Sequence, residues 1–369
     1  MDRQKLYEIA LVLVQGVGDV NGKKLIAYCG GAEAVFCESR RSLLKIPGIG
    51  ENTVNCIVSQ HTLLRAEKEM RFIERNGVQP LFYLDKDYPK RLQHCHDSPM
   101  MLYYKGNADL NAEKVVGIVG TRNVTDYGRN VIDKITQELS SDNVLIISGL
   151  AYGVDTVAHR SALKYGLATV GVLGHGLQII YPAENYKLAQ NMIEKGGILT
   201  EFLSDTKPDR ENFPKRNRIV AGMVDCLVVA ESALKGGAMI TADIANSYDR
   251  EVFAIPGRMG DTYSEGCNHL VKTNRADMME SAADLRYIMR WDHDTKVVAK
   301  QMRLFRDFSD DEKQVLDVFG NERVIHLDQI IVGTELTPTK IASVLLSLEF
   351  DGIVTALPGK RYQICDGIK

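Results

Sequence analysis

The chain has 369 residues, which is enough for two or three domains of about 150 residues each. Its composition, 45% hydrophobic and 25% charged, is that of an ordinary globular protein, and no apolar run approaches the roughly 18 residues that a membrane span needs. The net charge of −3 does not exclude a nucleic-acid partner, because phosphate binding depends on a local basic patch.

Cysteine usage and the N-terminal segment favour the cytoplasm. The seven cysteines include no Cys-x-x-Cys pair, which fits reduced thiols better than a disulfide framework. Asp2 and Glu8 interrupt the first residues, so this segment does not have the pattern of a signal peptide. We therefore expect a cytoplasmic protein that does not enter the membrane.

Residues 1–75 have the pattern of a small helical domain. Two turns, 16–18 and 46–50, alternate glycine with apolar residues, and a helical pattern follows each. The second turn resembles a helix-hairpin-helix or SAM-like module. Free amides at the start of the next helix can hold a phosphate, so this module either contacts DNA or serves only as a scaffold.

Residues 80–112 predict a strand and a loop that lead into the main domain. Within them, His94, Cys95, His96 and Asp97 are all possible metal ligands. Side chains at adjacent positions rarely converge on one ion, so we interpret the cluster as chance and expect no metal site.

The main domain, residues 76–290, alternates strands with helices. The strand candidates are β-branched and continuously apolar, as strands buried on both faces must be. They are residues 115–119, 144–147, 169–173, 198–201, 226–230 and 252–255. The helical stretches between them are residues 129–139, 156–165, 186–195, 218–223 and 242–248. This alternation predicts an extended Rossmann-like, doubly wound, mostly parallel sheet.

The loops that follow the predicted strands carry phosphate donors. Ligands of such sheets gather at the carboxyl ends of the strands. Arg122 follows Gly120-Thr121 there and offers a planar fork that grips phosphate bidentately. Ser148 and Gly149 occupy the equivalent place after the next strand, and Lys235 and Gly237 after a later one.

The densest cationic cluster is Phe213-Pro214-Lys215-Arg216-Asn217-Arg218. Three cations in four residues at a strand-end loop are more than solubility requires. Phe213 beside them can stack on a base, as aromatic platforms do in single-strand binders. The alternative is a solvated run of charges.

Asp155 and His159 lie one helical turn apart after the Ser148–Gly149 loop. An Asp–His pair can do acid–base chemistry. We favour the structural alternative, in which Asp155 caps the helix and His159 is hydrogen-bonded.

Signatures of enzymes and cofactors are missing. The strand-end glycines do not form Gly-x-Gly-x-x-Gly, no ribose-binding acid follows the second strand, and there is no Gly-x-x-x-x-Gly-Lys-[Ser/Thr] loop. No zinc or serine-hydrolase signature is present either. We therefore expect no bound cofactor and no catalytic residues.

Residues 291–308 have the pattern of a linker, and residues 309–369 that of a winged helix. Ser309 and Glu312 form a capping box, Thr337-Pro338 begins a second helix to residue 348, and strands 353–356 and 362–364 flank a hairpin turn. Its presumed recognition helix offers only Lys340 as a cation. This favours protein contact or structural support over DNA recognition.

Four motifs in this order resemble the DprA (Smf) family of bacterial DNA-processing proteins over nearly the full length. They are Gly120-Thr121-Arg122 and the segments 148–159, 213–222 and 251–257. The resemblance implies a homodimer that binds single-stranded DNA without hydrolysing it and loads RecA recombinase onto DNA coated with single-strand binding protein, during natural transformation or homologous recombination. The family's phosphate contacts map onto Arg122, Ser148, Gly149, Lys215, Arg218, Lys235 and Gly237, and its pocket residues onto Phe213 and Asn217.

Two departures separate this chain from the family pattern. Thr121 stands where the family commonly has Ser. Gly236-Gly237-Ala238 replaces a Ser-containing loop, which leaves backbone amides as the phosphate donors there. The segment 266–277 aligns with family regions implicated in self-association and RecA contact.

The alternative function is a nucleotide-processing enzyme of the lysine-decarboxylase-like phosphoribohydrolase class, which shares this sheet. That class is similar around a Pro-Gly-Gly-x-Gly-Thr loop with a following Glu. The corresponding stretch here runs from Lys235 to Thr241, followed by Asp243, and lacks the Pro and the Glu.

Overall fold

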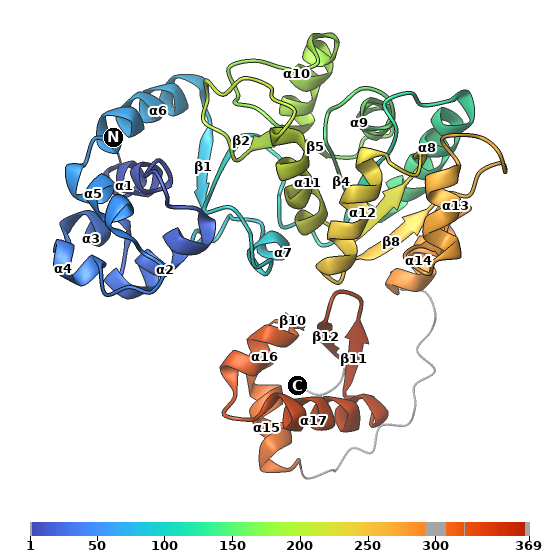
Figure 1. The fold of residues 1–369 in the computed structure, drawn as a ribbon. Coiled ribbons are helices and arrows are strands. Elements are labelled where there is room, and N and C mark those ends of the chain that lie inside the picture. Colours follow the sequence, from blue (N-terminus) through green and yellow to red (C-terminus); the bar gives the residue numbers. More distant parts are fainter. Residues whose placement is uncertain (1, 292–307, 321, 366–369) are drawn as a thin grey trace. The chain divides into compact units, whose positions relative to one another are not determined.

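A computed structural model of the protein describes residues 2–291, 308–320 and 322–365 (Figure 1). The chain divides into two compact units. The first comprises Met1–Tyr248 and Val252–Met278, and the second Asp249–Glu251 and Met279–Lys369. The linker expected at residues 291–308 falls almost entirely outside the described residues, and the four-part division by residue range stays a prediction.

The first unit begins with six helices, where the sequence predicts a small helical domain. They are α1 (Arg3–Val12), α2 (Asp19–Cys29), α3 (Ala32–Cys37), α4 (Arg40–Leu43), α5 (Glu51–Ser59) and α6 (Thr62–Asn76). The two glycine turns have the same backbone conformation, and each precedes a helix. Gly16 and Gly48 adopt φ of +83° and +86°, in the left-handed region that favours glycine, and Gly18 and Gly50 are the N-caps of α2 and α5.

A nine-stranded sheet follows, in the order β1-β2-β6-β5-β4-β3-β7-β8-β9. Its strands are β1 (Gln79–Phe82), β2 (Met101–Gly106), β3 (Val115–Val119), β4 (Leu145–Ser148), β5 (Thr169–Val172), β6 (Gly196–Thr200), β7 (Cys226–Val229), β8 (Glu251–Ala254) and β9 (Asp277–Met278). The β3–β4, β4–β5, β5–β6, β3–β7 and β8–β9 pairs are parallel, whereas β1 and β2 join antiparallel beside β6. The mostly parallel sheet predicted from the apolar runs is confirmed.

Helices cover both faces of this sheet (Figure 1). The helices α8 (Asp126–Leu139), α9 (Val154–Lys164) and α10 (Tyr186–Lys195) pack side by side, as do α7 (Lys90–Gln93), α11 (Asn212–Met223) and α12 (Gly237–Ser247). Both α9 and α11 contact β3, β4 and β5. The sheet is therefore doubly wound, and its core combines strand residues such as Val115, Ile147 and Val170 with Ile219 and Ala242 of the helices.

One helix differs from the prediction in a way that matters for the site. The sequence predicts a helix from residue 218, with the basic cluster in a loop, but α11 already begins at Asn212. Pro214 sits in the first turn, where no amide proton is needed. The cations of the cluster are consequently distributed around a helix.

The second unit contains α14 (Ala282–Met289) and a winged helix. The latter comprises α15 (Asp310–Phe319), β10 (Val324–His326), α16 (Leu327–Gly333), α17 (Pro338–Phe350), β11 (Val354–Leu357) and β12 (Arg361–Ile364). The capping box at Ser309, the N-cap at Thr337 and the antiparallel β11–β12 hairpin are as predicted, whereas β10 and α16 were not anticipated. Phe319, Ile341, Leu345 and Leu348 form its core.

Among the described helices, none is by itself long and apolar enough to cross a membrane. The consecutive helices α16 and α17 pass that test only as a pair, bent by 119°.

Candidate nucleic-acid interface

The candidate site lies where β3, β4 and β5 end and α11 begins. From β3 the strand order runs through β4, β5 and β6 toward one edge of the sheet, whereas β7 and β8 lie on the opposite side of β3, so the order reverses at β3. Ligands of doubly wound sheets bind at such a reversal of strand order, outside the carboxyl ends. The loops after these strands and the first turn of α11 enclose one pocket, lined by Arg122, Gly149, Ala151, Tyr152, Leu173, Gly174, His175, Tyr181, Pro182 and Phe213.

Arg122 and Phe213 form the polar and apolar halves of this pocket. The guanidinium carbon of exposed Arg122 lies 5.6 Å from the centre of the Phe213 ring. The Tyr181 ring lies 6.0 Å from the same ring, tilted by 40°. A cation beside two aromatic rings offers a phosphate contact and a base platform in one place.

Two glycines allow the loop after β4 to pack closely against its neighbours. Gly153 has φ of +77°, and a Cβ there would collide with the carbonyl oxygens of Thr121 and Arg122. A Cβ at Gly149 would collide with the guanidinium of Arg216. Glycine at both positions therefore lets the β4 loop close against the Arg122 loop and against α11.

Arg216 is buried and holds together the loops that line the pocket. Its guanidinium donates to the carbonyls of Gly149, at 2.5 Å, and Val172, which ties the ends of β4 and β5 to α11. Asp155 is also buried and accepts hydrogen bonds from the amides of Ala151 and Gly149. Burial raises the pKa of the Asp155 carboxyl, and the positive charge of Arg216 opposes that rise.

Two predicted phosphate donors are turned inward instead. Ser148 is fully buried and its hydroxyl donates to the Ile118 carbonyl at 2.5 Å, because the residue still belongs to β4. The Gly149 amide donates to Asp155, although Gly149 itself lines the pocket. Both residues shape the loop, and their direct contact with phosphate stays a prediction.

Asp155 and His159 do not form the acid–base pair that their spacing allows. The N-cap of α9 is Gly153 rather than Asp155. His159 is buried and its Nδ1 lies 2.7 Å from the Thr169 hydroxyl. Burial and, to a smaller extent, the charge of Arg216 together lower the pKa of His159 to about 3, so the ring is neutral at physiological pH. The preferred structural interpretation holds for His159, and the cap prediction for Asp155 was wrong.

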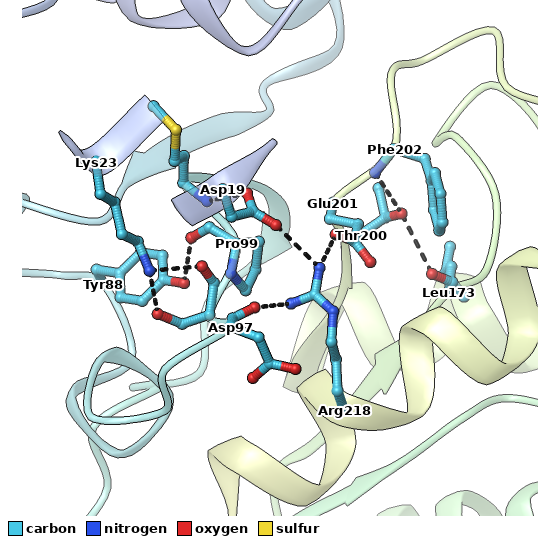
Figure 2. A network of polar contacts seen from close by, with 12 residues as sticks. Asp19, Lys23, Tyr88, Asp97, Pro99, Leu173, Thr200, Glu201, Phe202 and Arg218 are labelled. Carbon is cyan, nitrogen blue, oxygen red and sulfur yellow. Dashed lines mark hydrogen bonds and ion pairs between the residues drawn. The ribbon is translucent and has the colours of Figure 1, made fainter. Parts of the chain in front are cut away.

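Arg218 is engaged in an internal network (Figure 2). It forms an ion pair with Glu201, lies 3.3 Å from the Asp19 carboxylate and donates to the Asp97 carbonyl at 2.7 Å. Only 16% of its side chain is exposed. In this structure the guanidinium joins α11 to the N-terminal helices, and the phosphate contact by Arg218 stays a prediction.

The remaining predicted donors lie on the surface. Lys215 and Lys235 are exposed, and neither has a hydrogen bond or ion pair to any residue that the structure describes. Gly237 begins α12, no side chain caps that helix, and nothing stands within 4 Å of the place where its Cβ would be. Asn217 is half-buried and accepts from Arg216 at 3.3 Å.

Comparison with known proteins identifies the family. The model of DNA recombination-mediator protein A matches residues 79–290, and that of the DprA winged helix domain matches residues 305–360. Protein Smf of Synechocystis is 32% identical, with 98% of each chain covered. The chain belongs to the DprA family.

Other DprA proteins are similar in sequence and in structure. The DNA processing protein DprA of Streptococcus pneumoniae is 39% identical over 55% of this chain and 71% of its own length. Its X-ray structure superposes with a TM-score of 0.67, covering 76% of this chain and 97% of that one. DprA from Helicobacter pylori, whose structure describes a single-stranded DNA binding mode of that protein, has a TM-score of 0.53 at 30% identity and covers 58% and 96%.

Several pocket residues escaped the sequence interpretation. Tyr152, His175 and Tyr181 line the pocket, but Tyr152 lies in the loop after β4, the other two lie in the loop after β5, and no short motif joins them. The role of Arg216 was also missed. Successive helix residues are rotated by about 100°, so Arg216 had to face a different side of α11 from Lys215 and Arg218, which are three residues apart and share a face, and this spacing was the available signal.

The His94–Asp97 run is dispersed in the DprA fold. Cys95 is buried and its thiol lies 3.7 Å from the Arg91 carbonyl. The Asp97 carboxylate accepts from the Tyr248 hydroxyl, and the His96 ring packs edge-on against the Tyr248 ring. Cys95 and Asp97 thus have separate structural neighbours.

Proposed function

We propose that the chain binds single-stranded DNA without sequence preference at the pocket of Arg122 and Phe213. The observation that carries the proposal is the Arg122 guanidinium held over the Phe213 ring at the carboxyl edge of the sheet. Base stacking is sequence-tolerant because every base has a π-face, and phosphate contacts carry no sequence information.

The DNA-contacting groups follow from exposure. Arg122, Lys215 and Lys235 supply cations, the free start of α12 at Gly237 supplies backbone amides, and Phe213 supplies the stacking face. Asn217 lies one residue beyond Arg216 and borders the same turn of α11. Ser148, Gly149 and Arg218 act behind this surface by fixing the loops and the helix that carry it.

Fluorescence anisotropy with labelled single-stranded oligonucleotides tests the proposal. We expect Arg122→Glu and Lys215→Glu each to abolish binding while leaving circular dichroism and thermal unfolding unchanged. Each phosphate contact removed should also reduce the slope of log affinity against log salt by about 0.7. Unchanged affinity in both variants would contradict the assignment.

We also propose that the bound protein is a homodimer that loads RecA onto DNA coated with single-strand binding protein, in the cytoplasm. Membership of the DprA family supports this step, as does the similarity to DNA processing proteins over most of the chain. RecA ATPase activity on such coated DNA is the measurement. We expect the wild-type protein to shorten the lag and Arg122→Glu to lose that effect. An unchanged lag with wild-type protein argues against loading.

In this proposal the protein is not a catalyst. In the phosphoribohydrolase alternative, Asp243 would take the place of the acid of that class, but its carboxylate lies 2.8 Å from Arg275 on the α12 surface. A base-release assay with nucleoside monophosphates decides between the two functions, since turnover would favour the enzyme.

A further inference from the structure

A second hollow opens on the other side of the Arg122 loop. It has a volume of about 760 Å³ and lies between the start of α8, the end of β7 and the loop 256–264. Pockets of this size commonly receive small organic groups. The residues that give it chemical character are Thr125, Tyr127, Glu231, Arg258, Asp261 and Tyr263.

Two tyrosine rings form rigid walls of this hollow. The Tyr127 hydroxyl donates to the Pro256 carbonyl at 2.7 Å, yet 49% of the residue remains exposed. The Tyr263 hydroxyl accepts from the Asn123 amide at 2.8 Å. Because each ring is held at its far end, its face is presented without further loss of side-chain freedom, as a stacking platform requires.

The charges around the hollow favour a phosphate at one end. The Glu231 carboxylate is buried and already accepts from the Thr125 amide at 2.9 Å and the Thr125 hydroxyl at 2.5 Å. Arg258 is exposed, and its side chain has no hydrogen bond or ion pair within the described part of the chain. Exposed Asp261 repels phosphate on its own side, which leaves Arg258 as the anion contact.

The hollow shares a wall with the Arg122 pocket. Asn123, which holds Tyr263, is the residue after Arg122. The Thr121 amide donates to the Glu231 carbonyl at 2.7 Å, which fixes the same loop to the end of β7. A polymer bound at Arg122 therefore needs to cross only this loop to reach the second hollow.

We propose that this hollow holds a second nucleotide of the same single strand, with its base against Tyr127 and Tyr263 and its phosphate at Arg258. The inference rests on the proposed binding of single-stranded DNA at Arg122. A track with two base pockets predicts an affinity that depends on oligonucleotide length.

The test is anisotropy with two labelled oligothymidylates, one of about 4 nucleotides and one of about 16. We expect Arg258→Ala and Tyr127→Leu each to lower the affinity for the longer oligonucleotide about tenfold. For the shorter one, held at Arg122 alone, the loss should stay below about twofold. Tyr127→Phe keeps the ring but loses the hydrogen bond to Pro256, so its affinity for the longer oligonucleotide should lie between those of wild type and Tyr127→Leu.

Arg75→Ala, an exposed arginine on α6, is the matched control and should change neither affinity. If Arg258→Ala and Tyr127→Leu bind the longer oligonucleotide as wild type does, the second nucleotide site is overturned while binding at Arg122 stands. An equal loss for both lengths overturns it as well. If wild-type protein binds neither oligonucleotide, the proposed function itself fails, a result distinct from these two.

Discussion

Arg218 of α11 is ion-paired with Glu201 at the end of β6, and the same guanidinium nitrogen lies 3.3 Å from the Asp19 carboxylate on α2. In Figure 2, the Arg218 guanidinium points toward both carboxylates and the Asp97 carbonyl. This largely buried cation is thus one of the links between the sheet and the N-terminal helices. These contacts support a structural role for the network.

Arg218→Ala should therefore lower stability more than DNA affinity. Removing Arg218 leaves the buried carboxylates without a counter-charge, and we expect this to lower the free energy of unfolding by about 3 kcal/mol. Urea unfolding measures this loss. Lys215→Ala, three residues earlier and exposed, is the control, and should keep the stability and weaken DNA binding. The reverse pattern would return Arg218 to the DNA surface.

Glu201 should make stability depend on pH. Burial raises the pKa of its carboxyl from 4.5 to about 7, against the opposing charge of Arg218. The folded state therefore holds this proton more tightly than the unfolded state, and stability falls as the pH rises from 4.5 to 7. The change is about 3 kcal/mol if the unfolded pKa is the ordinary one. Urea unfolding of wild type and Glu201→Gln across this window measures it as the difference between the two curves, since only the wild type carries the Glu201 contribution. Parallel curves for the two proteins would contradict the assignment.

His159 should produce a pH dependence in the opposite direction. Burial lowers the pKa of His159 from 6.5 to about 3, so below pH 6.5 the unfolded state binds a proton that the folded state does not. The free energy of unfolding should therefore fall by about 1.4 kcal/mol for each unit by which the pH is lowered from 6.5 to 3. The His159→Asn variant removes this contribution, and the difference between its pH profile and that of wild type isolates it. Identical profiles would mean that the ring is not held neutral.

The sequence predicts most of the sheet because its signals are local. Continuous β-branched runs mark β3, β5 and β7 within a residue of their observed ends, and glycine turns mark the starts of α2 and α5. Such signals depend on neighbouring residues alone. The antiparallel placement of β1 and β2 depends on strand pairing across the fold, which no local pattern contains.

The candidate site was only half predictable for a related reason. The exposure of Arg122 and Lys215 could be predicted from their local positions alone, in a strand-end loop and near the start of a helix. The inward direction of Ser148, Arg216 and Arg218 depends on which carbonyls and carboxylates pack beside them. Residue type indicates a phosphate donor, but tertiary packing decides whether that donor reaches the surface.

Arg216→Lys should damage the pocket although the charge is kept. Lysine lacks the planar fork that reaches the Gly149 and Val172 carbonyls and faces Asp155. We expect a loss of about 2–4 kcal/mol in stability from the buried groups left without hydrogen bonds. In protein that remains folded at low temperature, affinity for single-stranded DNA should also fall, because the Gly149 loop lines the base pocket. Wild-type affinity in folded Arg216→Lys would show that Arg216 does not position that loop.

The winged helix should contribute little to binding of single-stranded DNA. The helix α17 has Lys340 as its one cation, and its ammonium group lies 2.8 Å from the Asp311 carboxylate of α15. A DNA-reading helix is normally rich in cations that are free to meet phosphate. We expect Lys340→Glu to change affinity for single- and double-stranded oligonucleotides less than twofold, whereas Lys215→Glu abolishes binding of the single strand. Lys313→Glu on α15, also exposed, controls for the change in net charge. A loss in Lys340→Glu comparable to that in Lys215→Glu, but absent in Lys313→Glu, would place α17 on the DNA and contradict a protein-binding or structural role for this domain.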